Sequence, residues 1–124
     1  KRALPLNVAG AYHSRLMASA QPKLQAVLER LPLQAPSGVV LSNVTAKPHD
    51  APGEIRTRLV EQVTSSVRWE ESMRHLLAEG FTRFIELGPG TALTGFMKRI
   101  DKNAQTLNVA NAANLAAAVA ALNG

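Results

Sequence analysis

The chain lacks cysteine entirely and is poor in aromatic residues. Without cysteine, a disulfide scaffold, a thiolate nucleophile and a zinc–thiolate site are excluded, which suits a cytoplasmic location. No apolar run approaches the roughly 20 residues that a membrane-spanning helix needs. One Trp, one Tyr and three Phe are too few for the stacking platforms of single-strand nucleic-acid binders. These absences argue against a membrane or a nucleic acid as partner.

Length and composition predict one globular domain, or part of one, over residues 1–124. A chain with 46% hydrophobic and 19% charged residues is typical of a folded soluble protein rather than a disordered one. The net charge of +5 favours an anionic partner. Only Lys98, Arg99 and Lys102 cluster, and the other basic residues are scattered. A small basic nucleic-acid binder, whose DNA affinity would depend on salt, therefore stays open only as an alternative.

Hydrophobic periodicity predicts helices that alternate with strands. We expect helices over residues 14–31 (kinked or broken at Pro22), 54–62, 69–79, after the glycines of 88–90, and 112–122. Strands are expected over 3–9, 37–45, 81–87 and 105–110, the second of them buried on both faces. Gly80 should end one helix and Asn111 should cap another. This alternation predicts an α/β fold with a parallel sheet covered on both faces.

A glycine-rich turn, GPGTALTG over residues 88–95, follows one predicted strand and opens a helix. Main-chain amides at such a place can hold an anion. However, Gly95 is followed by Phe96 and not by the lysine of a phosphate-binding loop, and Leu93 stands where the dinucleotide motif needs glycine. A tight strand-to-helix turn, in which glycines permit unusual dihedral angles, is favoured over an anion site.

The three histidines are far apart and form no HxxxH or HExxH pair, so we predict no metal site. His49, in a loop with proline and aspartate, is expected to face solvent, and His75 to be solvated or hydrogen-bonded. His13, in GAYHSRLM, stands where the chain is expected to enter a helix. A histidine there could take a proton from a serine nucleophile and return it to a leaving group, or it could be an ordinary helix-start residue.

The sequence contains no obvious nucleophile for His13. Ser14 is adjacent, but consecutive side chains diverge. The nucleophile-elbow motif G-x-S-x-G occurs nowhere in the 124 residues. Taken alone, the residues offer a base without a nucleophile.

Four stretches resemble, in the same order, motifs of malonyl-CoA:acyl-carrier-protein transacylases and of the related acyltransferase domains of fatty-acid and polyketide synthases. GAYHSRLM is similar to the histidine motif, LSNVTAKP to a strand, LVEQVTSSVRWEESM to paired helices, and FIELGPGTALTGFMKRI to the glycine-turn strand and helix. The resemblance covers nearly all of the chain. It implies the C-terminal part of the family's hydrolase-like parallel-sheet subdomain, with residues 1–8 as the exit of the small ferredoxin-like subdomain.

The resemblance implies a ping-pong acyl transfer without a cofactor. A serine takes malonyl from malonyl-CoA as an ester and then yields it to the phosphopantetheine thiol of an acyl carrier protein. His13 would activate the serine and protonate the departing thiolate. The main-chain carbonyl of Gln62, rather than its side chain, would fix the ring tautomer. Tyr12 would line the substrate site, where its ring could crowd an α-methyl group.

The resemblance also implies partners that these residues do not contain. The family's serine elbow, the arginine that pairs with the malonyl carboxylate and a glutamine segment of the oxyanion hole are expected in an upstream half of the same enzyme. The chain alone is therefore expected to be inactive. The alternative function is that of a non-catalytic fragment or module, which binds an acidic carrier protein through its basic residues.

Overall fold

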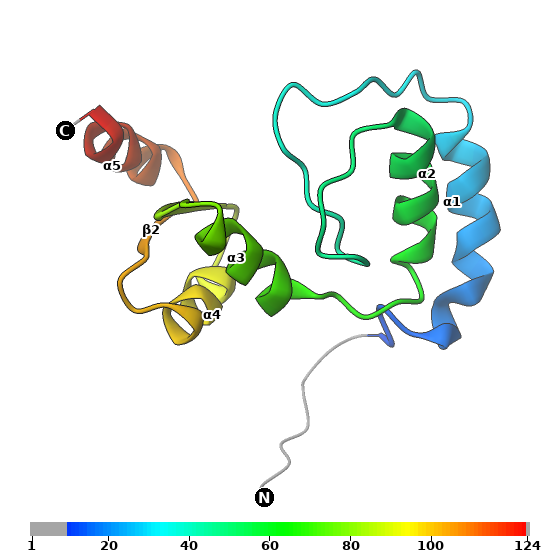
Figure 1. The fold of residues 1–124 in the computed structure, drawn as a ribbon, viewed down its shortest axis with the longest axis horizontal. Coiled ribbons are helices and arrows are strands. Elements are labelled where there is room, and N and C mark those ends of the chain that lie inside the picture. The colour runs from blue at the N-terminus through cyan, green and yellow to red at the C-terminus, as the bar shows by residue number, and fades with distance from the viewer. Residues whose placement is uncertain (1–9, 124) are drawn as a thin grey trace, which may run out of the picture. The chain divides into compact units, whose positions relative to one another are not determined.

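The computed structural model describes residues 10–123 (Figure 1), and the chain divides into two compact units at the Ser72–Met73 bond. The first unit holds the 3-10 helix η1 (Arg15–Ala20) and the helices α1 (Gln21–Leu28) and α2 (Pro52–Glu61). The second unit holds β1 (Arg83–Leu87), α4 (Ala92–Ile100), β2 (Gln105–Val109) and α5 (Ala112–Asn123), while α3 (Trp69–Ala78) runs across the boundary. The strand predicted over 3–9 and the subdomain exit assigned to 1–8 lie outside the described residues. Among residues 10–123, no helix has the length and apolar character needed to cross a bilayer.

The helix predicted over 14–31 is broken at Pro22, as expected. The 3-10 helix η1 precedes the break, and Pro22 stands in the first turn of α1. A proline is tolerated there because the first amides of a helix have no intrahelical acceptor. Ser14 caps η1, since its hydroxyl oxygen accepts the Leu16 amide at 3.3 Å.

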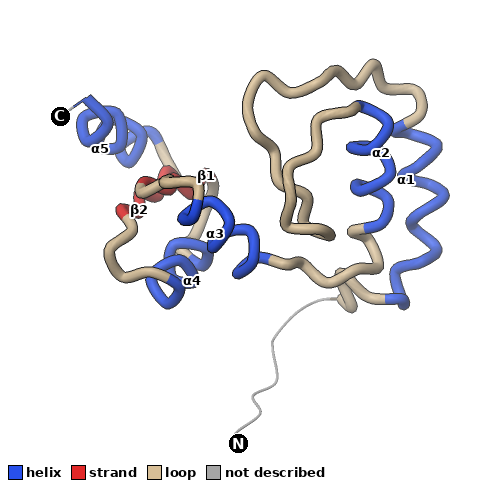
Figure 2. The backbone as a smooth tube through the Cα atoms, in the orientation of Figure 1, coloured by secondary structure: helices blue, strands red, loops and turns tan. Residues whose placement is uncertain are grey.

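Helices α1 and α2 lie side by side and antiparallel in the first unit (Figures 1 and 2). Near one end of the pair, the Gln21 side chain donates to the Val60 carbonyl at 3.2 Å. Near the other, the Arg56 guanidinium donates to the carbonyls of Leu28 at 3.1 Å and Leu31 at 2.9 Å. The Arg56 guanidinium therefore adds donors from α2 to carbonyls at and just after the end of α1, which also accept the Leu31 and Leu33 amides.

The strand expected over residues 37–45 is not formed, so this prediction is wrong. The segment makes one isolated bridge, Leu41 to Pro48, and a turn in which the Ser42 amide donates to the Lys47 carbonyl at 2.9 Å. Val39 is 66% exposed instead of buried. An apolar run becomes a strand only where other strands satisfy its backbone, and within residues 10–72 no named strand is present to do so.

The second unit contains a parallel two-stranded sheet with α4 as the connection, as the alternation predicted. The register runs from Arg83 opposite Gln105 to Leu87 opposite Val109 (Figure 2). Both strands contact α4, and β2 also contacts α5. Within the described residues, β1 is not covered on both faces as expected. Its Ile85 and Leu87 side chains are 42% and 77% exposed, whereas Phe84 is half-buried.

Both predicted helix-end signals are confirmed. Gly80 follows α3 with φ +89°; its amide donates to the Leu77 carbonyl and the next amide, of Phe81, to the Leu76 carbonyl, both at 3.0 Å. This pattern closes a helix through a left-handed residue that favours glycine. Before α5, the Asn111 side-chain oxygen accepts the Asn114 amide at 3.0 Å.

Candidate functional site

His13 lies in the turn before η1, with a left-handed backbone at φ +57°. This conformation is uncommon for a residue other than glycine, although histidine is enriched in it. Ser14 braces the turn, because its hydroxyl donates to the Ala11 carbonyl at 2.7 Å and accepts the Leu16 amide. Strained backbone of this kind persists where surrounding contacts hold it, and it is often found at functional positions.

The imidazole of His13 is joined to a residue 49 positions away in the sequence. Its Nδ1 lies 2.8 Å from the main-chain carbonyl oxygen of Gln62. A carbonyl oxygen only accepts hydrogen bonds, so Nδ1 carries the hydrogen, and in the neutral ring Nε2 keeps its lone pair. The ring is therefore held in the tautomer that a base acting through Nε2 requires.

The Gln62 carbonyl can accept this bond because of its place at the end of α2. Gln62 is the C-cap residue, and its own amide donates to the Arg58 carbonyl at 3.0 Å. The last carbonyls of a helix have no intrahelical partner. That of Gln62 accepts both His13 Nδ1 and, at 3.3 Å, the Ser65 amide. The structure thus brings together the two residues that the sequence singled out; their catalytic role stays a prediction.

Like His13, Tyr12 is exposed, whereas His49 is placed differently from expectation. The Tyr12 side chain is 62% exposed, and its ring lies against Gly10, where an added Cβ would come within 3.2 Å of Cζ. His49 does not face solvent as predicted: it is 7% exposed, because its loop folds back and its amide donates to the Val40 carbonyl at 3.1 Å. Among residues 10–123, no three histidine and acidic side chains gather in a possible metal site.

The glycine-rich turn is a tight turn, and two amides of the helix that follows it are bound within the chain. Gly88 and Gly90 have φ angles of +130° and +89°. The Glu86 carboxylate accepts the amides of Leu93 at 3.1 Å and Thr94 at 2.9 Å, where an external anion would otherwise bind. Sequence reasoning missed Glu86; the signal was an acidic residue between the apolar Ile85 and Leu87 of the strand, directly before a helix-opening turn.

Acid should weaken the contact between Glu86 and α4. The pKa of Glu86 is held below its usual value by the nearby Thr94 hydroxyl first, and then by the main-chain amides of Thr94 and Leu93. The Thr94 hydroxyl lies close to the carboxylate but outside hydrogen-bond geometry. A lowered folded-state pKa contributes stability above the unfolded value of about 4.3, and this is lost as pH falls through the folded value. We expect Glu86→Gln to flatten the decline of stability between about pH 5 and 3, as measured by thermal unfolding. An unchanged pH slope would contradict this assignment.

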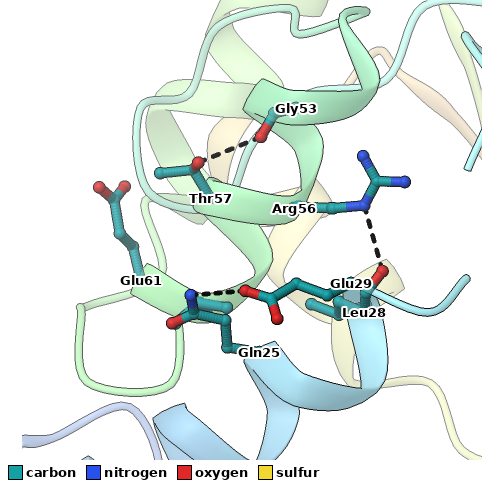
Figure 3. A pocket seen from close by; sticks show the side chains of 8 residues that line it. Gln25, Leu28, Glu29, Gly53, Arg56, Thr57 and Glu61 are labelled. Carbon is teal, nitrogen blue, oxygen red and sulfur yellow. Dashed lines mark hydrogen bonds between the residues drawn. The ribbon is translucent and has the colours of Figure 1, made fainter.

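A hollow of about 370 Å³ lies between α1 and α2 (Figure 3). Several of its polar groups are hydrogen-bonded within the chain. The side-chain amide of Gln25 donates to the Glu29 carboxylate at 2.9 Å, and the Thr57 hydroxyl donates to the Gly53 carbonyl at 3.1 Å. His13 is not among its lining residues. We therefore keep His13, and not this hollow, as the candidate functional site.

Comparison with known proteins identifies relatives over nearly the whole chain. No family model matches it. A malonyl CoA-acyl carrier protein transacylase of Bacillus subtilis is 40% identical over 122 residues, which are 98% of this chain and 38% of that protein. A polyketide biosynthesis malonyl CoA-acyl carrier protein transacylase of Bacillus velezensis is 45% identical over 96 residues, 77% of this chain and 33% of that protein.

The same likeness is seen in three dimensions. The crystal structure of an acyl carrier protein S-malonyltransferase from Vibrio cholerae superposes with a TM-score of 0.87 at 39% identity. The match covers 95% of this chain and 39% of that one. The chain therefore spans about two fifths of the length of such relatives, and its α/β fold is that of the corresponding part of them.

Proposed function

Because the chain belongs to the malonyl-CoA:acyl-carrier-protein transacylase family over the part of those proteins that it spans, we propose that it supplies the proton carrier for malonyl transfer from coenzyme A to an acyl carrier protein. The observation that carries the proposal is the 2.8 Å hydrogen bond from His13 Nδ1 to the Gln62 carbonyl. That bond leaves Nε2 as the ring atom that can accept a proton.

In the first half-reaction, His13 Nε2 takes the proton of a serine hydroxyl while the serine oxygen bonds to the malonyl thioester carbon. The C–S bond then breaks, and the imidazolium returns the proton to the coenzyme A thiolate. In the second, Nε2 takes the proton of the carrier protein's thiol as its sulfur attacks the serine ester. The C–O bond breaks, and the serine oxygen regains a proton from His13.

A carbonyl partner suits this cycle. The Gln62 oxygen orients the ring without placing a full negative charge beside it, whereas a carboxylate would favour the charged imidazolium form. The proton taken from the nucleophile is therefore returned more easily to the leaving group. Tyr12, the neighbour of His13, is proposed to contact the acyl group, and the net charge of +5 suits anionic coenzyme A and an acidic carrier protein.

The proposal requires a serine from outside these residues. Residues 1–124 hold no G-x-S-x-G motif, so the chain alone should not transfer malonyl. Joined to the upstream portion of the Bacillus subtilis relative, it should transfer malonyl from coenzyme A to an acyl carrier protein, as measured with labelled malonyl-CoA.

The matched control is the same joined protein with its upstream nucleophilic serine replaced by alanine. It should be folded and inactive. A folded joined protein that transfers no malonyl, or transfer by the 124 residues alone, would contradict the proposed function.

A further inference from the structure

We propose that Asn43 is a positioning residue for His13, acting through the side chain of Gln62; this rests on the proposed function of His13. Asn43 Nδ2 donates to Gln62 Oε1 at 3.0 Å, and the carbonyl of the same glutamine accepts His13 Nδ1. Three residues from separate parts of the sequence thus form one chain of contacts. The side chain of Gln62, to which the sequence assigned no task, has a specific one.

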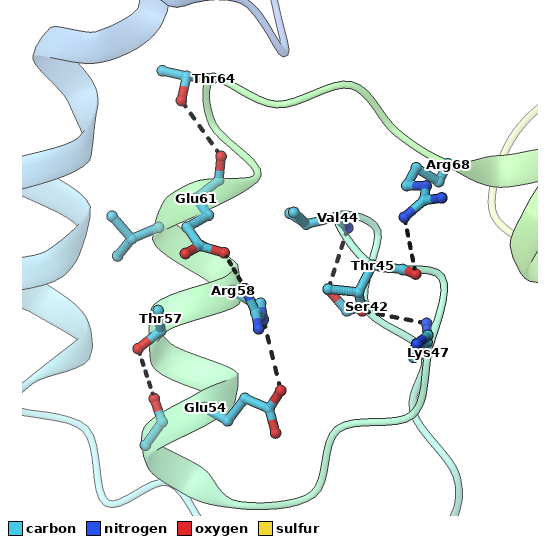
Figure 4. Close-up of polar contacts among 12 residues, drawn as sticks. Ser42, Val44, Thr45, Lys47, Glu54, Thr57, Arg58, Glu61, Thr64 and Arg68 are labelled. Carbon is cyan, nitrogen blue, oxygen red and sulfur yellow. Dashed lines mark hydrogen bonds and ion pairs between the residues drawn. The ribbon is translucent and has the colours of Figure 1, made fainter.

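Asn43 is itself firmly held. Its carbonyl accepts the Arg68 amide at 2.9 Å, and the Arg68 guanidinium donates to the Thr45 carbonyl at 3.3 Å (Figure 4). Arg68 also pairs with Glu71 in the first turn of α3, with Nε at 2.8 Å from a carboxylate oxygen. On the other side of Asn43, Ser42 is 2% exposed and its hydroxyl accepts the Val44 amide at 3.2 Å.

The loop around Asn43 therefore acts as a fixed support and not as a loose partner. Gln62 follows the last turn of α2, where a helix end can fray. With its amide bound to the Arg58 carbonyl and its side chain bound to Asn43, the residue has little freedom to rotate. Its carbonyl is thereby kept toward His13.

Loss of the Asn43 side-chain amide removes one of the two hydrogen bonds that hold Gln62. The Gln62 carbonyl can then turn toward the Ser65 amide alone, which it already accepts at the longer distance of 3.3 Å. His13 Nδ1 would lose part of its preference for carrying the hydrogen, and some of the rings would adopt the opposite tautomer, in which Nε2 is protonated and cannot act as a base.

The test uses the enzyme in which this chain is joined to a serine-bearing portion. Asn43→Ala should lower kcat about three- to tenfold, the range of one ordinary hydrogen bond, with KM little changed. The ¹⁵N shifts of the His13 ring should move from an Nδ1–H pattern toward a mixture of tautomers. Gln34→Ala, an exposed change in the same unit, is the matched control and should alter neither quantity.

A double-mutant cycle separates positioning from general loosening. Gln62→Ala removes the same hydrogen bond and keeps the main-chain carbonyl, so it should match Asn43→Ala, and the double variant should be no worse than either. If Asn43→Ala fails to fold, the kcat and the His13 ring shifts of Gln62→Ala test the positioning role instead. If His13→Asn abolishes transfer while Asn43→Ala and Gln62→Ala leave both kcat and the ring shifts unchanged, the positioning role is overturned and the proposed function stands. If His13→Asn leaves transfer intact, the proposed function itself fails.

Discussion

Replacing His13 by asparagine should lower malonyl transfer by about 10²- to 10⁴-fold, the usual contribution of a general base. The loss should appear in kcat in both half-reactions, because one imidazole takes and returns the proton in each. Asparagine is the sharper choice over alanine, since it tolerates the left-handed backbone that His13 adopts at φ +57° and keeps a donor for the Gln62 carbonyl. The measurement is single-turnover malonyl transfer in the enzyme that joins this chain to a serine-bearing portion.

Two controls make the result specific. His13→Ala should be as inactive as His13→Asn, because neither side chain can take and return a proton as an imidazole does. It should also be less stable because of the left-handed backbone. Ser14→Ala should weaken the η1 cap and the turn that carries His13, which reduces stability, but it keeps the imidazole and should therefore lower transfer far less than His13→Asn. Transfer by His13→Asn within a few-fold of the parent rate would remove His13 from the chemistry.

Replacing Met97 by alanine should produce the largest loss of stability in the second unit. Met97 lies on α4, is 2% exposed, and is the largest side chain that the described residues bury almost fully. Truncation of a buried methionine leaves a cavity and typically costs about 2–5 kcal/mol. We expect the opening free energy of the amides of β1 and β2, measured by native-state hydrogen exchange, to fall by this amount.

Leu93→Ala is the matched control for Met97 because it lies on the same helix but is 40% exposed. It removes a side chain of comparable size and leaves its main-chain bond to Glu86 in place. The loss should be less than half of that for Met97→Ala. Equal losses at the two positions would mean that α4 does not pack against the strands through the face that carries Met97.

The parts of the fold that could be predicted depend on signals acting within a turn or two of the chain. Pro22 breaks a helix because it has no amide hydrogen, Gly80 accepts a left-handed backbone because it has no Cβ, and Asn111 caps through its own side-chain oxygen. The segment 37–45 could not be predicted in this way. Its apolar residues have the composition of a strand, but pairing requires neighbouring strands that local composition does not specify.

The candidate site divides in the same way. Resemblance of motifs pointed to His13 and Gln62, and the contact between them depends on how the turn before η1 meets the end of α2, 49 residues later. Asn43 and Glu86 were in quoted motifs, but nothing in their spacing said which amide or side chain each would meet. Hydrogen bonds between distant residues follow from the path of the backbone and not from the residue types alone.

Residue types along the chain thus predicted where most helices end and that two strands run parallel, and the resemblance of motifs indicated which histidine is the candidate base. The folded chain was needed to see which carbonyl that histidine contacts, that Glu86 binds the amides after the glycine turn, and that residues 37–45 form a loop. The reason is physical: backbone preferences and caps act locally, whereas tautomer, anion occupancy and strand pairing depend on groups brought together from far apart in the chain.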